Sequence, residues 1–149
     1  MKFADSVGRI LRQKGSEVHC VTPQVTVYEA LERMAEKDIG ALLVMRGNDV
    51  VGLMSERDYV RKVILKGFSS KDLTVEDIMT SPAATVSPGT TVDECMRLMT
   101  DQRCRYLTVV EEGMVRGVVS IGDLVNWIIT VQDLTIHQLE DYISGRYPA

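Results

Sequence analysis

The sequence predicts a mixed α/β (α+β) fold in which two tandem β-α-β-β-α repeats pack sheet to sheet, with a helix at each end of the chain. Three observations predict it. The chain carries an internal repeat, each copy alternates helical and β-type apolar patterns, and 45% hydrophobic with 26% charged residues is typical of a compact globular protein.

The internal repeat becomes visible when the sequence is shifted by 65 residues without a gap, which aligns fourteen identical pairs between residues 21 and 65. Most pairs are apolar, and two copies of any core would share them. Two of the polar pairs occupy the same point of each copy, at the start of its second helix: Ser55 with Ser120, and Asp58 with Asp123. These four residues are the first candidates for a shared function.

Local patterns predict the elements of each copy. A short strand leads to a helix capped by Thr26 or Thr91, and the apolar residues of that helix recur at i, i+3, i+4 and i+7. Two β-rich runs then flank a Gly-containing turn and form a hairpin, and a second helix of about three turns starts at Ser55 or Ser120. The expected strands are 18–21, 41–45 and 50–54 in the first copy, and 84–86, 106–110 and 114–119 in the second.

A unit of about 60 residues is too small to bury its strands well, so the two copies are expected to share one core. Terminal helices are expected at about 3–13 and 134–144, ending at Gly15 and Gly145, with apolar stripes that close a core or a dimer interface. Trp127 is expected to pack internally or to anchor a dimer contact. The predicted division is an N-terminal helix at 1–15, a first repeat at 16–66, a linker at 67–77, a second repeat at 78–132 and a C-terminal helix at 133–149.

Composition argues against several classes of protein. A net charge of −4 gives no general attraction to nucleic acid, and the three cysteines show no metal-ligand or disulfide spacing. The chain has no secretory signal pattern and no apolar stretch of membrane-spanning length, which predicts a cytoplasmic protein. His19 and His137 lie in no catalytic constellation, so no catalytic residue and no metal ligand is expected.

The repeated motif Gly-x-x-Ser-x-x-Asp, at Gly52–Asp58 and Gly117–Asp123, joins a strand to the start of a helix. A phosphate can dock at a helix N-terminus beside the serine, and the aspartate can accept hydrogen bonds from both hydroxyls of a ribose. The glycine would let a ligand approach the strand backbone. Ser-x-x-Asp is equally a capping box, in which both side chains only close the helix end. The motif alone leaves both interpretations open.

Together with the linker segment Ile78-Met79-Thr80, these motifs resemble the CBS domain family over roughly Lys14 to Val131. The paired form of that family is called a Bateman module, and the chain looks like a stand-alone bacterial-type signal-transduction protein with two CBS domains. In that family the Ser/Thr-x-x-Asp pattern contacts phosphate and ribose. The segment Arg103–Val110 also matches, although Tyr106 and Thr108 stand where histidine and proline are frequent.

The resemblance implies two clefts, each built from both repeats. The cleft with Asp123 would include Ser120, the strand edge Ile39, Gly40 and Ala41, and the segment around Lys14, with Arg105 and Tyr106 facing its phosphate. The cleft with Asp58 would include Ser55, Arg57, Thr80, and the strand edge Cys104, Arg105 and Tyr106.

The implied function is a non-catalytic regulatory module that binds AMP, ATP or NAD(H) in these clefts. We expect no effector domain, so the signal would pass by a conformational shift to an unknown effector protein or through a homodimer. The alternative is a ligand-free dimerisation scaffold, in which the repeated Ser and Asp are merely caps. A third hypothesis is an enzyme that acts on the bound nucleotide.

Overall fold

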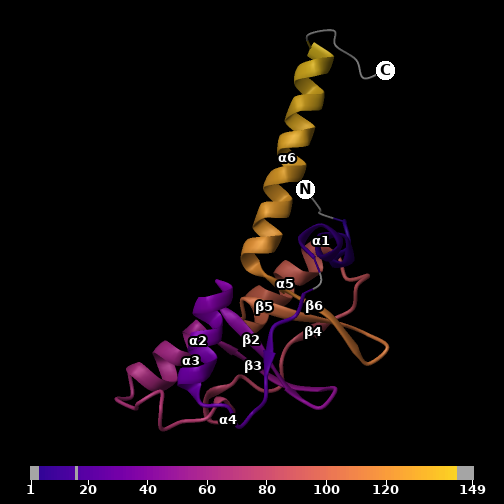
Figure 1. Cartoon of the computed structure of the whole chain (residues 1–149). Helices are drawn as coiled ribbons and strands as arrows, with labels where there is room; N and C mark the ends of the chain where they lie inside the picture. The colour runs from indigo at the N-terminus through magenta and orange to yellow at the C-terminus, as the bar shows by residue number, and fades with distance from the viewer. Residues whose placement is uncertain (1–3, 16, 144–149) are drawn as a thin grey trace.

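The computed structural model describes residues 4–15 and 17–143 and contains two three-stranded sheets with helices around them (Figure 1). In the first repeat the elements are β1 (Cys20–Val21), α2 (Val27–Lys37), β2 (Ala41–Arg46), β3 (Asp49–Ser55), α3 (Glu56–Tyr59) and the π-helix η1 (Val60–Ile64). In the second they are β4 (Thr85–Val86), α5 (Val92–Gln102), β5 (Tyr106–Glu111), β6 (Met114–Ser120) and α6 (Ile121–Ile143). The short helices α1 (Val7–Lys14) and α4 (Val75–Ile78) precede the two repeats.

Both sheets have the same topology, which confirms the predicted β-α-β-β-α repeat. The first strand runs parallel to the second, and the second and third form an antiparallel hairpin, in the order β1-β2-β3 and β4-β5-β6. The hairpin turns contain Gly47 and Gly113, whose positive φ angles of 62° and 75° are readily adopted by glycine. The strands are shorter or longer than expected by a residue or two at their ends.

The same local signals start and end the first helix of each repeat. The hydroxyls of Thr26 and Thr91 accept hydrogen bonds from the amides of Glu29 and Glu94, at 3.1 and 3.2 Å. The helices end in the left-handed region at residues 38 and 103, with φ angles of 53° and 52°. The expected caps are therefore confirmed.

The expectation of a single shared core is wrong, because each repeat has its own. Residues of the first core are Val21, Val27, Ala30, Met34, Leu42, Val44, Met54, Val63, Val75 and Ile78. Residues of the second are Val7, Ile10, Leu11, Val92, Cys95, Met99, Leu107, Val109, Val119 and Leu124. The helix that precedes each repeat closes the core of the other repeat, which supplies the apolar area that one unit lacks.

This exchange uses the same hydrogen bonds on both sides. In the first repeat the amide of Val27 donates to the carbonyl of Leu73, and in the second the amide of Val92 donates to that of Asp5, each at 2.9 Å. The crossing helices donate in return. The amide of Val75 in α4 donates to the carbonyl of Val25, and the amide of Val7 in α1 donates to the carbonyl of Thr90, each at 2.8 Å. Thus α1 and α4 are equivalent elements that cross between the repeats, and α1 closes a core as expected.

The C-terminal end of the chain differs from the prediction. We expected a second-repeat helix of about three turns and a separate helix from Leu134, but α6 is continuous from Ile121 to Ile143. No Pro or Gly after Gly122 interrupts it, so the helical backbone continues through the predicted boundary at 132/133. Figure 1 shows its second half rising away from both sheets. Phe3, Ser144 and Gly145, at the expected ends of the terminal helices, lie outside the described residues.

Trp127 lies in the first half of α6 and packs against the second core. Its indole N–H donates to Oδ2 of Asp5 at 3.0 Å, and the guanidinium of Arg9 lies 5.8 Å from the centre of a ring of the same indole. The packing interpretation is thus confirmed. Within residues 4–15 and 17–143, none of the helices has the length and apolarity needed to cross a membrane.

Candidate functional site

Two clefts lie between the repeats, each lined by residues from both. The first, of about 490 Å³, contains Asp58, and the second, of about 410 Å³, contains Asp123. Both volumes fall in the range of small-ligand sites. Leu53 and Tyr106 line both clefts, so the two lie on either side of the same inter-repeat contact.

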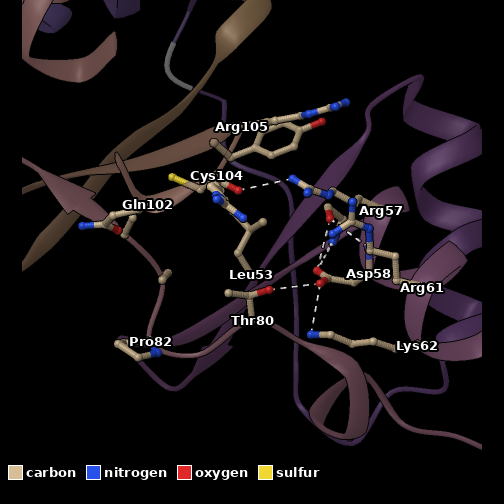
Figure 2. Close-up of a pocket in the computed structure, with 15 residues that line it drawn as sticks. Leu53, Arg57, Asp58, Arg61, Lys62, Thr80, Pro82, Gln102, Cys104 and Arg105 are labelled. Carbon is tan, nitrogen blue, oxygen red and sulfur yellow. Dashed lines mark hydrogen bonds and ion pairs between the residues drawn. The ribbon is translucent and has the colours of Figure 1, made fainter. Parts of the chain in front are cut away.

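In the first cleft, Asp58 is held by a dense set of contacts (Figure 2). Its Oδ2 accepts hydrogen bonds from the amide and hydroxyl of Ser55, at 3.0 and 3.1 Å. Its Oδ1 accepts from the hydroxyl of Thr80 at 3.0 Å and lies 3.2 Å from Nζ of Lys62. Thr80 itself is fixed by two backbone hydrogen bonds with Leu53, so the connector forms one wall of this cleft.

In the second cleft, Asp123 has fewer partners. Its Oδ2 accepts from the amide of Ser120 at 2.8 Å and lies 2.6 Å from Nζ of Lys14, which also donates to the carbonyl of Val118 at 2.9 Å. The Asp123 side chain is 22% exposed, against 10% for Asp58. The end of α1 therefore brings a cation to this aspartate, from the segment around Lys14 that the resemblance implied for this cleft.

The capping interpretation of Ser-x-x-Asp is realised in the geometry. The hydroxyls of Ser55 and Ser120 accept from the amides of Asp58 and Asp123, at 3.2 and 3.1 Å, while each carboxylate accepts from its own serine amide. Capping occupies Oδ2 in both copies, and a carboxylate has about four acceptor positions. Asp123 can therefore cap its helix and still offer Oδ1 to a ligand, whereas Oδ1 of Asp58 already contacts Thr80 and Lys62.

The role we expected for the motif glycines is wrong, because protein side chains cover both. A Cβ on Gly52 would lie 2.7 Å from Sδ of Met79 and 2.9 Å from the carbonyl oxygen of Thr80. A Cβ on Gly117 would lie 2.7 Å from Cδ2 of Leu11. These glycines admit the crossing helices, which leaves no room there for a ligand.

The strand edges that precede β2 and β5 line the clefts as expected. Ile39, Gly40 and Ala41 line the Asp123 cleft, and Cys104, Arg105 and Tyr106 line the Asp58 cleft. A Cβ on Gly40 would lie 2.5 Å from the hydroxyl oxygen of Tyr106, so glycine is required for this close approach. Burial, and then the charge of Glu56, raise the pKa of Tyr106 above its usual value, which keeps the phenol neutral and able to donate.

All of the predicted site residues line one of the clefts, with one difference in placement. Arg105 was expected to face both ligands, but it lines only the Asp58 cleft, whereas Tyr106 lines both.

Sequence reasoning missed other lining residues. Arg61 and Lys62 line the Asp58 cleft, and their spacing of three and four residues from Asp58 on one helical face was a usable signal. Glu17, His19 and Asp38 line the Asp123 cleft, and nothing in the local pattern marked them.

A family model described as the CBS domain matches this chain twice, over residues 7–65 and 75–134. The chain belongs to the CBS domain family. Its two CBS domains form a regulatory module of the Bateman type, and the resemblance seen in the sequence is thereby confirmed. The two clefts are thus the clefts of a CBS pair.

Known proteins with CBS domains are similar over most of the chain. The mitochondrial CBS domain-containing protein CBSX3 of Arabidopsis thaliana is 40% identical over 138 residues, covering 89% of this chain and 66% of that protein. A protein with CBS domains from Burkholderia ambifaria MC40-6 has 47% identity and a TM-score of 0.81, over 84% of this chain and 94% of that one. A hexameric CBS-CP12 protein from bloom-forming cyanobacteria has 27% identity and a TM-score of 0.74, over 80% and 70%.

Proposed function

We propose that this CBS pair binds adenine nucleotides, namely AMP, ATP or NAD(H), as a non-catalytic regulatory module. The observation that carries the proposal is the position of Asp58 and Asp123: each lies in a cleft built from both repeats. Both clefts are large enough for a small ligand. Capping by itself gives no reason for an open cleft at each cap.

The contacts of each aspartate suit a ribose diol. Oδ1 of Asp58 contacts the side chains of Thr80 and Lys62, which a ligand hydroxyl can displace or share. Oδ1 of Asp123 has no hydrogen bond within the described part of the chain. The neutral phenol of Tyr106 and the backbone of the strand edges supply donors, acceptors and a flat surface for adenine.

Signalling follows from the construction of the clefts. A ligand that contacts both repeats has different affinities for different arrangements of the repeats, and it shifts the population toward the arrangement it binds better. The signal then passes to an effector protein or to a second copy of the chain.

Homodimerisation is part of the proposal, because equivalent apolar side chains of the two repeats are exposed to the same degree. Val60 and Val125 are 44% and 43% exposed, and Ile64 and Ile129 are 51% and 50% exposed. Such a matched pair of surfaces suits a symmetric interface between two copies, in which the same patch serves both partners. The cyanobacterial relative is itself hexameric, which favours self-association in this architecture.

The second half of α6 extends the same apolar surface. Ile129, Ile136 and Ile143 recur every seven residues, Val125 lies four residues before Ile129, Leu139 lies between Ile136 and Ile143, and all five are exposed. Seven-residue spacing is typical of helices that pair along a seam. An isolated helix of this length is only marginally stable in water, so pairing with a second copy would stabilise it.

Isothermal titration calorimetry with AMP, ATP and NADH tests the binding proposal. We expect saturable heat with at least one nucleotide, and a loss of about 10- to 100-fold in affinity at the altered cleft of Asp123→Ala, because a charged hydrogen-bond acceptor is lost. A circular dichroism spectrum must show that the variant is folded. The absence of binding heat with every nucleotide would favour the ligand-free scaffold. Chemical conversion of the nucleotide during long incubation would favour an enzyme.

Analytical ultracentrifugation tests the dimer. The double substitution Ile136→Ser with Leu139→Ser should shift the sedimenting species toward the monomer. Thr135→Ser with Gln138→Ser introduces the same number of serines into the same helix outside the seam and should leave the dimer intact. Equal association of both variants would contradict a seam on α6.

A further inference from the structure

The two clefts differ sharply in charge. The Asp58 cleft is lined by five basic side chains, Arg57, Arg61, Lys62, Arg103 and Arg105, with Asp58 as the acid. The Asp123 cleft is lined by Lys14 and His19 together with three acids, Glu17, Asp38 and Asp123. A site with this excess of cations attracts polyanions, whereas the second cleft does not.

The difference in charge between the clefts arises at individual aligned positions of the two repeats. At a shift of 65 residues, none of the five basic residues has a basic counterpart in the second cleft. The helix that follows the cap carries Gly122, Asn126 and Trp127 in place of Arg57, Arg61 and Lys62. At the end of the first helix, Arg103 faces one cleft where Asp38 faces the other, and both adopt the same left-handed conformation.

The cations also differ in how far they are already neutralised. Lys14 lies 2.6 Å from Oδ2 of Asp123 and donates to a carbonyl, so its charge is largely engaged. In the first cleft, Lys62 pairs with Asp58, but Arg61 and Arg105 form no ion pair within the described residues. The guanidinium of Arg57 donates to the carbonyl oxygen of Arg103 at 3.2 Å and forms no ion pair in the part of the chain that the structure describes. The first cleft therefore retains guanidinium groups for an anionic ligand.

From this asymmetry we infer that the two clefts take different ligands. The Asp58 cleft binds adenine nucleotides with a di- or triphosphate, and the Asp123 cleft binds adenine nucleosides that carry little negative charge. The inference rests on the proposed function and deepens it. One chain would bind phosphorylated and unphosphorylated adenine ligands at separate sites. Guanidinium groups suit this task because they hold phosphate oxygens in bidentate geometry.

Calorimetric titration of single-cleft variants tests the inference. Asp123→Ala retains the Asp58 cleft, and we expect affinities in the order ATP, ADP, AMP, adenosine, with the ATP affinity falling steeply between 50 and 500 mM KCl. Asp58→Ala retains the Asp123 cleft, and we expect adenosine to bind at least as tightly as ATP, with little effect of salt. The same order of affinities in both variants would overturn the inference.

Because Asp58 is buried and caps a helix, a second pair of variants avoids it. Arg61→Ser with Arg105→Ser replaces exposed side chains and should weaken ATP binding on the order of tenfold while leaving adenosine binding unchanged, since each exposed ion pair contributes a few-fold. Arg97→Ser, an exposed arginine of α5 outside both clefts, is the control for a general loss of charge. Equal weakening of both ligands would overturn the inference. If the unaltered protein bound neither ligand, the proposed function itself would fail.

Discussion

Thr108 is the one residue whose chemistry conflicts with its surroundings in the described part of the chain. Its side chain is 1% exposed and its hydroxyl has no hydrogen-bond partner there. Leu107 and Val109 point into the second core, so Thr108 faces the other side of the sheet, and its counterpart at that position of the first repeat is Leu43. An unpaired buried hydroxyl lowers the stability of the fold.

Thr108→Val should therefore stabilise the protein by about 1 kcal/mol, because valine has the same shape and no hydroxyl to desolvate. The free energy of unfolding from urea titration measures this. Thr91→Val makes the same change at a helix cap and should destabilise by about 1 kcal/mol. A loss of stability in Thr108→Val would show that the hydroxyl has a partner.

Cys95 links the second core to pH. Its side chain is fully buried, and burial raises the pKa of the thiol to about 11, with a further contribution from the charge of Glu94. The unfolded chain ionises this thiol above pH 9 while the folded chain keeps it neutral. The associated stability is therefore complete below pH 9 and is lost as the pH rises toward 11.

Comparison with Cys95→Ala isolates this effect. The difference in unfolding free energy between the two proteins should shrink on the order of 2 kcal/mol between pH 9 and pH 11. Cys20→Ala, at an exposed thiol, is the matched control and should show no such trend. A constant difference across this range would mean that Cys95 does not carry the pH dependence.

At the residue scale, comparison of the two copies identified the polar groups that repeat, whereas Arg57, Thr80 and Arg105 were named only through the family resemblance. Ser55, Asp58, Ser120 and Asp123 were found because an identity between copies cannot be explained by apolar patterning. Asp38 and Arg103 were not recognised as equivalent positions, because their charges are opposite. Both nevertheless adopt the same left-handed backbone conformation. A comparison of the two repeats that looks only for identical residues misses the positions where the copies differ.

Helix α1 is the element on which the second core depends. Val7, Ile10 and Leu11 are at most 7% exposed, and Leu11 lies over Gly117 of β6. The periodic apolar stripe predicted an amphipathic helix, but its partner was not predictable from the stripe. The crossing with α4 became apparent only from long-range hydrogen bonds.

Ile10→Ala should therefore destabilise the protein by about 2–5 kcal/mol, because it leaves a cavity in the second core. Arg12→Ala, on the exposed face of the same helix, should change the free energy of unfolding little. Urea denaturation of the two variants measures the contrast. Similar values for both would mean that α1 does not close this core.

At the scale of the whole molecule, two units with separate cores meet at clefts rather than in one merged interior. The β-α-β-β-α order within each repeat followed from local periodicity and the repeat, whereas the helix α4 and the continuity of α6 did not. The separation of the cores did not, because it depends on which repeat each crossing helix covers. Both clefts therefore lie between the two repeats, where a bound ligand would contact both.

Selectivity for the sugar provides a test at this scale. A carboxylate that accepts from a ribose diol repels a 2′-phosphate on the same sugar, so we expect NADH to bind at least tenfold more tightly than NADPH. Competition titrations at one ionic strength measure the ratio. Equal affinities would argue against an aspartate at the ribose.

Native mass spectrometry with saturating ATP and adenosine together tests the central claim most directly, because it counts the ligands bound to each chain. Two ligand molecules should bind per chain of the unaltered protein, one in Asp58→Ala, one in Asp123→Ala, and none when both are replaced. Undiminished binding in the doubly substituted chain, or no bound ligand in the unaltered protein, would contradict the assignment of these carboxylates as the ligands of adenine nucleotides and nucleosides.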